Sequence, residues 1–87
     1  MKTNTALSLE QLRRISEEWR SARPQYSDGV VLIWDGKAYG WKAELREPHH
    51  ERPGVVAVNE SGHVFIAEGG NYNDGAKHWV VAVETGK

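Results

Sequence analysis

The stretch "GVVLIWDGKAYGW" (29–41) decides the fold of this protein. Residues 30–34 are continuously apolar, which is typical of a strand that is buried on both faces. Asp35-Gly36 follows directly and predicts a β-hairpin, because a type I′ turn needs positive φ at both central residues. The sequence therefore predicts a buried strand, a two-residue turn and a return strand.

The return strand, residues 37–45, alternates with a period of two. This period predicts one face made of Tyr39, Trp41, Ala43 and Leu45. Lys42 and Glu44 fall on the other face, so this strand would be tolerated at the edge of a sheet.

Before the hairpin, residues 8–22 have a helical pattern. Ser8 is a candidate N-cap, and Gln11 stands three residues later, as in a capping box. Pro24 excludes the preceding residue from the helical region and so ends the helix. One face forms an apolar stripe, which consists of Leu9, Leu12, Ile15, Trp19 and Ala22. The other face is expected to be solvated and carries Glu10, Arg13, Arg14, Glu17 and Glu18.

After the hairpin, a polar connection (46–54) leads to a second hairpin with strands 55–59 and 63–68. A loop rich in Gly and Asn (69–77) precedes the last apolar run, residues 79–83. The predicted fold is α+β: one N-terminal amphipathic helix packed on a five-stranded, mainly antiparallel sheet that is strongly curved or barrel-like. We expect a single domain (1–87) with a flexible tail (1–7), the helix (8–22) and the sheet (30–84), in which all four Trp share one core.

The last run, residues 79–83, has no polar residue, and an apolar strand at a free edge is an aggregation hazard. Three arrangements would cover it. The sheet could close with the first strand beside the fifth, the strand order could be 2-1-5-4-3, or the strand could pair with a second copy. The interface residues would be Trp79, Val81 and Val83.

The composition excludes several classes of function. Eleven Lys and Arg balance twelve Asp and Glu, and the resulting net charge of −1 argues against nucleic-acid binding. The absence of Cys excludes disulfides and thiolate chemistry. No apolar stretch has the length of a signal peptide or membrane span, so we expect a cytoplasmic protein without membrane contact.

Signals for chemistry are weak. His49 and His50 are adjacent, but no further ligands are spaced for a metal, and we expect no metal and no cofactor. Loop 69–77 is longer than a hairpin needs, and long ordered loops are often functional. The candidate ligand-binding residues are Tyr39, Trp41, Asn71, Tyr72, Asn73, Asp74 and His78.

These observations favour a small non-enzymatic binding or adaptor protein that acts through protein–protein contacts. Its size fits an accessory protein of mobile DNA, and its expected partner is a second copy or another protein. The alternative is a small-ligand-binding protein or minimal enzyme, with a pocket between the sheet and loop 69–78. No catalytic residue can be named from the sequence.

Overall fold

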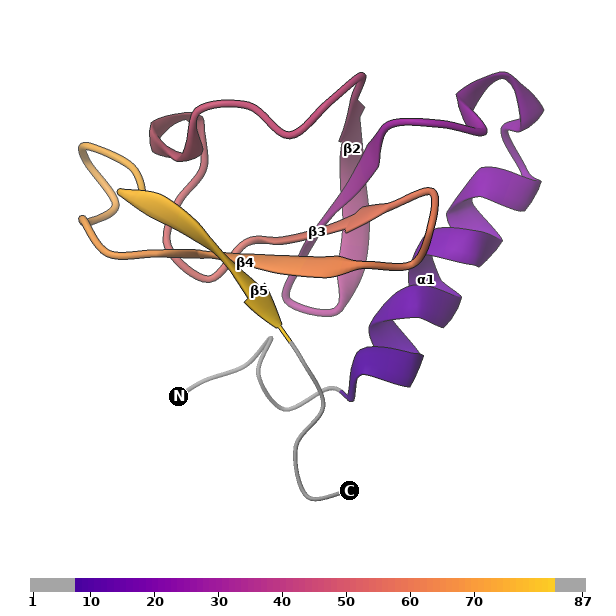
Figure 1. Cartoon of the computed structure of the whole chain (residues 1–87), viewed down its shortest axis with the longest axis horizontal. Coiled ribbons are helices and arrows are strands. Elements are labelled where there is room, and N and C mark those ends of the chain that lie inside the picture. The colour runs from indigo at the N-terminus through magenta and orange to yellow at the C-terminus, as the bar shows by residue number, and fades with distance from the viewer. Residues whose placement is uncertain (1–7, 83–87) are drawn as a thin grey trace.

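The computed structural model describes residues 8–82, within which one α-helix packs on a five-stranded antiparallel sheet (Figure 1). The elements are α1 (Leu9–Ser21), β1 (Val30–Trp34), β2 (Lys37–Lys42), β3 (Val56–Asn59), β4 (Val64–Glu68), β5 (His78–Ala82) and the short 3₁₀ helices η2 (Pro24–Tyr26) and η3 (Pro48–His50). The predicted α+β class is confirmed. The sheet is open, however, so the barrel-like alternative is wrong. The expected tail 1–7 and Val83 lie outside the described residues.

The strand order is β2-β1-β3-β4-β5, so β2 and β5 form the two edges. The edge position of β2 was predicted, whereas the order 2-1-5-4-3 and a closed sheet with β1 beside β5 are wrong. β1 takes β3 as its second neighbour, with a register that runs from Val30↔Asn59 to Ile33↔Val56. The run Val55–Val58 is fully buried and supplies the cover that β1 requires. β3 therefore takes the position beside β1 that two of the predicted arrangements gave to β5, and β5 lies at an edge of the sheet.

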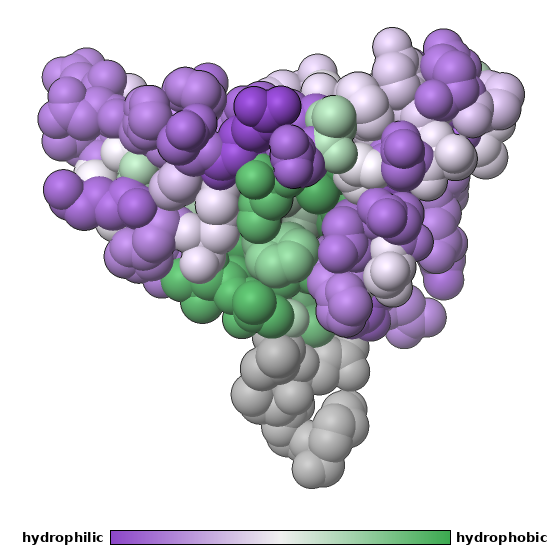
Figure 2. All heavy atoms as spheres, turned by 45° about the horizontal axis from the view of Figure 1, so that its top comes forward, coloured by the Kyte–Doolittle hydropathy of each residue, from purple (hydrophilic) through white to green (hydrophobic). Residues whose placement is uncertain are grey.

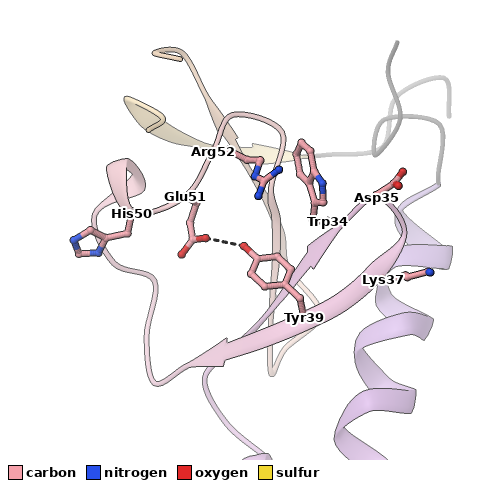
Figure 3. Close-up of a pocket in the computed structure, with 7 residues that line it drawn as sticks. All are labelled: Trp34, Asp35, Lys37, Tyr39, His50, Glu51 and Arg52. Carbon is pink, nitrogen blue, oxygen red and sulfur yellow. Dashed lines mark hydrogen bonds between the residues drawn. The ribbon is translucent and has the colours of Figure 1, made fainter. Parts of the chain in front are cut away.

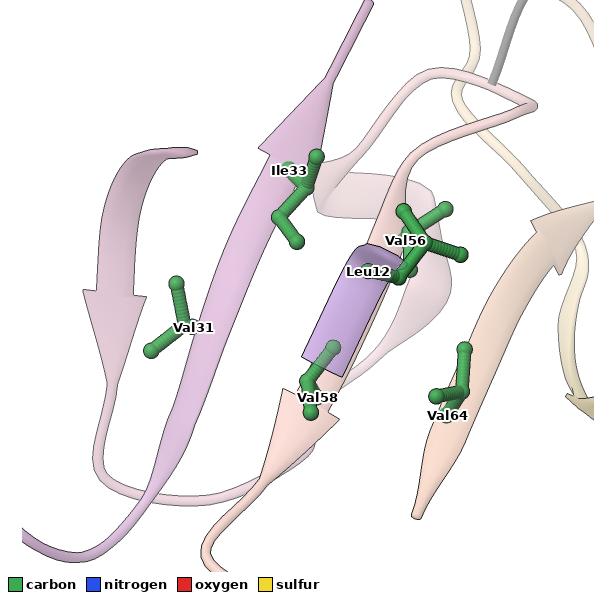
Figure 4. Close-up of a cluster of buried hydrophobic side chains, with 6 residues drawn as sticks. All are labelled: Leu12, Val31, Ile33, Val56, Val58 and Val64. Atoms are coloured by element: carbon green, nitrogen blue, oxygen red, sulfur yellow. The ribbon is translucent and has the colours of Figure 1, made fainter. Parts of the chain in front are cut away.

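Alternation along β1 divides the core into two clusters. Val31 and Ile33 point to the side of α1, where Leu12 projects onto the sheet (Figure 4). The buried members of this first cluster are Leu12, Val31, Ile33, Val56, Val58 and Val64. Val30 and Leu32 point to the opposite side. The second cluster also contains Val55, Ala57, Ala67 and Ala76, with Trp34, Leu45, Phe65 and Trp79 packed against it.

The four Trp residues do not share one core, contrary to prediction. Trp19 and Trp41 pack against the first cluster, on the side of the helix. Trp34 and Trp79 pack against the second cluster, on the opposite side. Successive side chains of a strand point to opposite faces of the sheet. Trp34 therefore points to the face opposite that of Val31, whereas Trp41, which pairs with Val31, lies on the same face as Val31.

The helix begins with the predicted capping box. The Gln11 amide donates to Ser8 Oγ at 3.1 Å, and the Ser8 amide donates to Gln11 Oε1 at 2.9 Å. Leu12 is buried, while Ala22 lies just beyond the helix and is exposed. Ser16 is also buried, and its hydroxyl donates to the Arg13 carbonyl at 2.9 Å.

Two arginines join the helix to the rest of the chain. The guanidinium of Arg20 donates to four carbonyl oxygens at 2.7 to 3.2 Å, those of Tyr26, Asp28, Gly29 and Val58. Arg13 Nε donates to the carbonyl of Gly62, in the β3–β4 turn, at 2.6 Å. Arg13 is therefore half-buried rather than solvated, which corrects the prediction for that face. The carbonyl groups of a distant turn could not be inferred from the spacing of charges along the helix.

The β1–β2 hairpin has the predicted turn. Asp35 and Gly36 have φ values of 55° and 78°, the positive values that a type I′ turn requires. The register between β1 and β2 shifts by one residue within the hairpin: Leu32 is opposite Gly40, but the next residue, Ile33, is opposite Ala38. Tyr39 is thus the extra residue of a β-bulge, and a bulge changes the direction in which nearby side chains point.

Candidate functional site

The bulge separates two residues that the sequence pattern placed on one face. Trp41 packs on the first cluster, and its indole stacks on Tyr26 with ring centroids 4.7 Å apart. Its Nε1 donates to the Asp28 carbonyl at 2.6 Å. Tyr39 instead faces the connection between β2 and β3 (Figure 3). A strict period of two assumes an unbroken strand, so it could not reveal this separation.

Tyr39 lines a hollow of about 540 Å³ that is open to solvent (Figure 3). The walls come from two parts of the chain: the β1–β2 hairpin, and the end of η3 with the two residues that follow it. The lining residues are Trp34, Asp35, Lys37, Tyr39, His50, Glu51 and Arg52. Only Tyr39 belongs to the ligand-binding set that the sequence suggested.

Glu51 is the buried carboxylate of this region, with 9% of its surface exposed. Tyr39 donates its hydroxyl hydrogen to Glu51 Oε1 at 2.7 Å, and Lys42 Nζ lies 2.8 Å from Oε2. The Glu51 carbonyl accepts the amide of Ala76 at 2.8 Å. Glu51 therefore ties β2 to the loop before β5, and both of its carboxylate oxygens are engaged. Nothing local distinguishes it in the sequence, because Tyr39 and Lys42 lie twelve and nine residues away.

The environment raises the pKa of the Tyr39 phenol well above its ordinary value. Partial burial is the largest cause, since it disfavours the phenolate. The hydrogen bond to Glu51 and its negative charge act in the same direction, while Arg52 opposes them. Tyr39 therefore remains a hydrogen-bond donor, which suits a positioning role better than proton transfer near neutral pH.

Arg52 lies over the Trp34 ring, with its guanidinium carbon 4.6 Å from the ring centroid. The same carbon is 5.8 Å from the ring of Tyr72, which meets Trp34 edge-on at 6.3 Å. Arg52 is exposed, and its guanidinium has no hydrogen bond or ion pair with another residue in the described range 8–82. The hollow thus has a cation at its wall that is held by aromatic rings.

The loop before β5 holds itself in shape with the polar side chains that the sequence suggested as ligand contacts. Asn71 Oδ1 accepts the Asp74 amide at 2.7 Å, and Asn71 Nδ2 lies 3.3 Å from Asp74 Oδ2. Asn73 and His78 are exposed, and Tyr72 is 69% exposed beside Trp34. A second open hollow of about 470 Å³ borders this loop, and of the predicted residues it contains only Asn71 and Asp74.

The predicted interface strand is an edge of the sheet in this chain. Val80 is 37% and Val81 is 54% exposed. Trp79 is half-buried, and its Nε1 donates to the Arg46 carbonyl at 2.7 Å. The two arrangements that would cover this strand within the chain are therefore wrong, and pairing with a second copy stays a prediction. Figure 2 shows one band of hydrophobic side chains across the middle of the face it presents, with hydrophilic groups on both sides.

Residues 8–82 contain neither a cluster of metal ligands nor a helix that could span a membrane. Between residues 8 and 82, no three His, Cys, Asp or Glu side chains converge as metal ligands would. The His49 and His50 rings lie 4.4 Å apart, and both residues are exposed. No helix of the same range is long and apolar enough to cross a bilayer.

The sequence matches no protein-family model, and no curated protein or solved structure is significantly similar to it.

Proposed function

We propose that this protein is a non-enzymatic binding module that acts through the free edge of β5, and that its partner there is a second copy of the chain. The observation that carries this proposal is the exposure of Val80 and Val81 on an edge strand. Such a strand is a template for pairing with another strand, because its outward N–H and C=O groups have no neighbour within the sheet.

The two edge strands differ in how well they are protected against pairing with a strand of another molecule. β2 carries Lys37 and Lys42 and contains the bulge at Tyr39, and both features discourage pairing with another strand. β5 has neither feature, since its five residues include no Lys, Asp, Glu or Pro. With one protected edge and one open edge, pairing ends after two copies instead of continuing into a fibre.

The sequence of β5 is compatible with antiparallel pairing to itself. A twofold axis at Val80 places Trp79 of each copy opposite Val81 of the other, on one face of the joined sheet. The Val80 side chains of the two copies meet on the other face, which is the face of the sheet that carries α1. No like charges oppose each other when His78 is neutral, and the net charge of −1 produces little repulsion between copies.

The test is the mass in solution, measured by light scattering over a wide range of concentration. Wild-type protein should show the mass of a dimer, and Val81→Lys should show that of a folded monomer. Because Val81 is 54% exposed within the chain, the circular dichroism spectrum of the variant should not change. The matched control is Gln25→Lys, which adds the same charge at an exposed position away from β5 and should remain a dimer. A wild-type protein that remains monomeric up to millimolar concentration would refute the proposal.

A further inference from the structure

We propose that the hollow beside Trp34 is a binding site for a small, flat carboxylate, of which an aromatic carboxylate is the simplest form. This site is independent of the β5 edge. The proposal rests on three features of the hollow: a cation that has no acidic partner among residues 8–82, aromatic walls beside it, and a suitable volume.

The cation is Arg52. A guanidinium presents a planar fork of N–H donors that matches the two oxygens of a carboxylate. Arg52 Cζ lies 4.6 Å from the centroid of the Trp34 ring, and this cation–π contact does not use the N–H donors as hydrogen bonds. No acceptor in residues 8–82 takes these donors. A bound carboxylate would satisfy them.

The charges around the hollow favour an anion. Glu51 is balanced by Lys42, whose Nζ is 2.8 Å from the carboxylate. Asp35 and Lys37 also line the hollow and contribute one charge of each sign. The lining itself therefore carries two cations, Lys37 and Arg52, and two carboxylates, Asp35 and Glu51. Because Lys42 pairs with Glu51 from outside the lining, the lining and Lys42 together carry a net charge near +1 with His50 neutral.

The aromatic walls favour a flat molecule. Trp34 and Tyr39 line the hollow (Figure 3). The ring of Tyr72 meets Trp34 edge-on, with ring centroids 6.3 Å apart. Aromatic rings bind planar groups by stacking or by edge contacts. The volume of about 540 Å³ lies within the range of about 300–1,000 Å³ that is usual for small-molecule sites.

A second arginine provides an internal control. Arg23 lies 4.5 Å over the Trp19 ring, almost the same geometry as Arg52 on Trp34. Arg23 Nη1, however, donates to the Trp19 carbonyl at 3.2 Å. Arg23 also has no place in the lining of the Trp34 hollow. If stacking on Trp were sufficient for binding, the two arginines would behave alike.

The test is a titration of isotope-labelled protein with benzoate, followed by nuclear magnetic resonance. The side-chain N–H signals of Trp34 and Arg52 should shift and saturate, and those of Trp19 and Arg23 should not. Arg52→Gln should weaken benzoate binding roughly tenfold or more, because it removes a charge-assisted interaction. Arg23→Gln should leave the affinity unchanged.

Two further ligands test the chemical class. Benzyl alcohol retains the ring but lacks the charge, and inorganic phosphate retains the charge but lacks the ring. Both should bind more weakly than benzoate. The proposal is overturned if benzoate causes no saturable shift at Trp34, or if the two Arg variants are weakened equally. It is also overturned if either comparison ligand binds as well as benzoate. Arg52 is exposed, so its variant should fold, and the backbone amide spectrum verifies this.

Discussion

Tyr39 donates a hydrogen bond of 2.7 Å to Glu51 Oε1, and this contact joins a bulged residue of the edge strand β2 to the connection that covers the second cluster. The partner of Tyr39 is nearly buried, and its other oxygen is engaged by Lys42. The contact therefore positions one wall of the hollow.

An ultraviolet titration of the native protein should show that Tyr39 ionises above the ordinary pH range of a tyrosine. Burial and the Glu51 carboxylate raise its pKa above the ordinary value of about 10. Tyr39→Phe should delete the late transition, whereas Tyr72→Phe should leave it in place. Glu51→Gln should move the transition to lower pH, because the amide removes the negative charge. The absence of a late transition in the wild-type protein would contradict the effect of the site on Tyr39.

The same shift predicts how stability changes at high pH. The pKa of Tyr39 is higher in the folded state, so its contribution is fully present below the unfolded pKa of about 10 and is lost as the pH rises through the folded pKa. Denaturant unfolding at alkaline pH should therefore show a smaller loss of stability in Tyr39→Phe than in wild type. Equal slopes of stability against pH in the two proteins would count against this linkage.

Arg20→Ala should lower the free energy of unfolding by about 2–3 kcal/mol, because four carbonyl oxygens lose a charged donor. Arg14→Ala on the same helix is the matched control. Arg14 has a side chain that is 68% exposed and lies 3.8 Å from Glu10, so its removal should cost less than about 1 kcal/mol. Similar losses in the two variants, measured by urea unfolding, would show that Arg20 does not join the helix to the sheet.

The two glycines of the β1–β2 hairpin should respond oppositely to alanine. Gly36→Ala should cost about 1–2 kcal/mol, because Gly36 has a φ of 78° in the left-handed region. At Gly40 an added Cβ would make only an ordinary contact, 3.9 Å from Leu32 Cδ1. Gly40→Ala should therefore be neutral or stabilise by up to about 1 kcal/mol. The melting temperatures of both variants provide the measurement. A higher melting temperature for Gly36→Ala than for wild type would contradict the type I′ turn at Asp35-Gly36.

Gly75→Ala should detach the loop before β5 from η3. The φ of Gly75 is 85°, and a Cβ at this position would collide with the His49 carbonyl. The expected cost is about 2–4 kcal/mol from strain and overpacking. Hydrogen exchange at the Ala76 amide, which donates to the Glu51 carbonyl at 2.8 Å, should accelerate. Asn73→Ala in the same loop should change neither quantity, since Asn73 is exposed.

Glu51 shows why the candidate site could not be predicted from the sequence. Its side chain is paired by Tyr39 and Lys42 of β2, and its carbonyl by the amide of Ala76. The partners come from two segments, β2 and the loop before β5, and neither has a spacing from Glu51 that a motif would describe. Arg52 likewise meets Trp34 and Tyr72 only after the chain has folded. The sequence did suggest Tyr39 and Tyr72 as candidate ligand-binding residues, but it could not reveal that Arg52 lies beside Tyr72.

The sequence by itself determined the features that depend on near neighbours: the capping box of Ser8 and Gln11, the Asp35-Gly36 turn and the succession of one helix and five strands. These features are local because caps, turns and hydrophobic periods are set by interactions within a few residues. Only the tertiary structure decided that β3 lies beside β1, that β5 is an edge and that Tyr39 is bulged. Several apolar strands could have covered β1, and the choice among them depends on contacts between residues far apart in the chain, which no local pattern records.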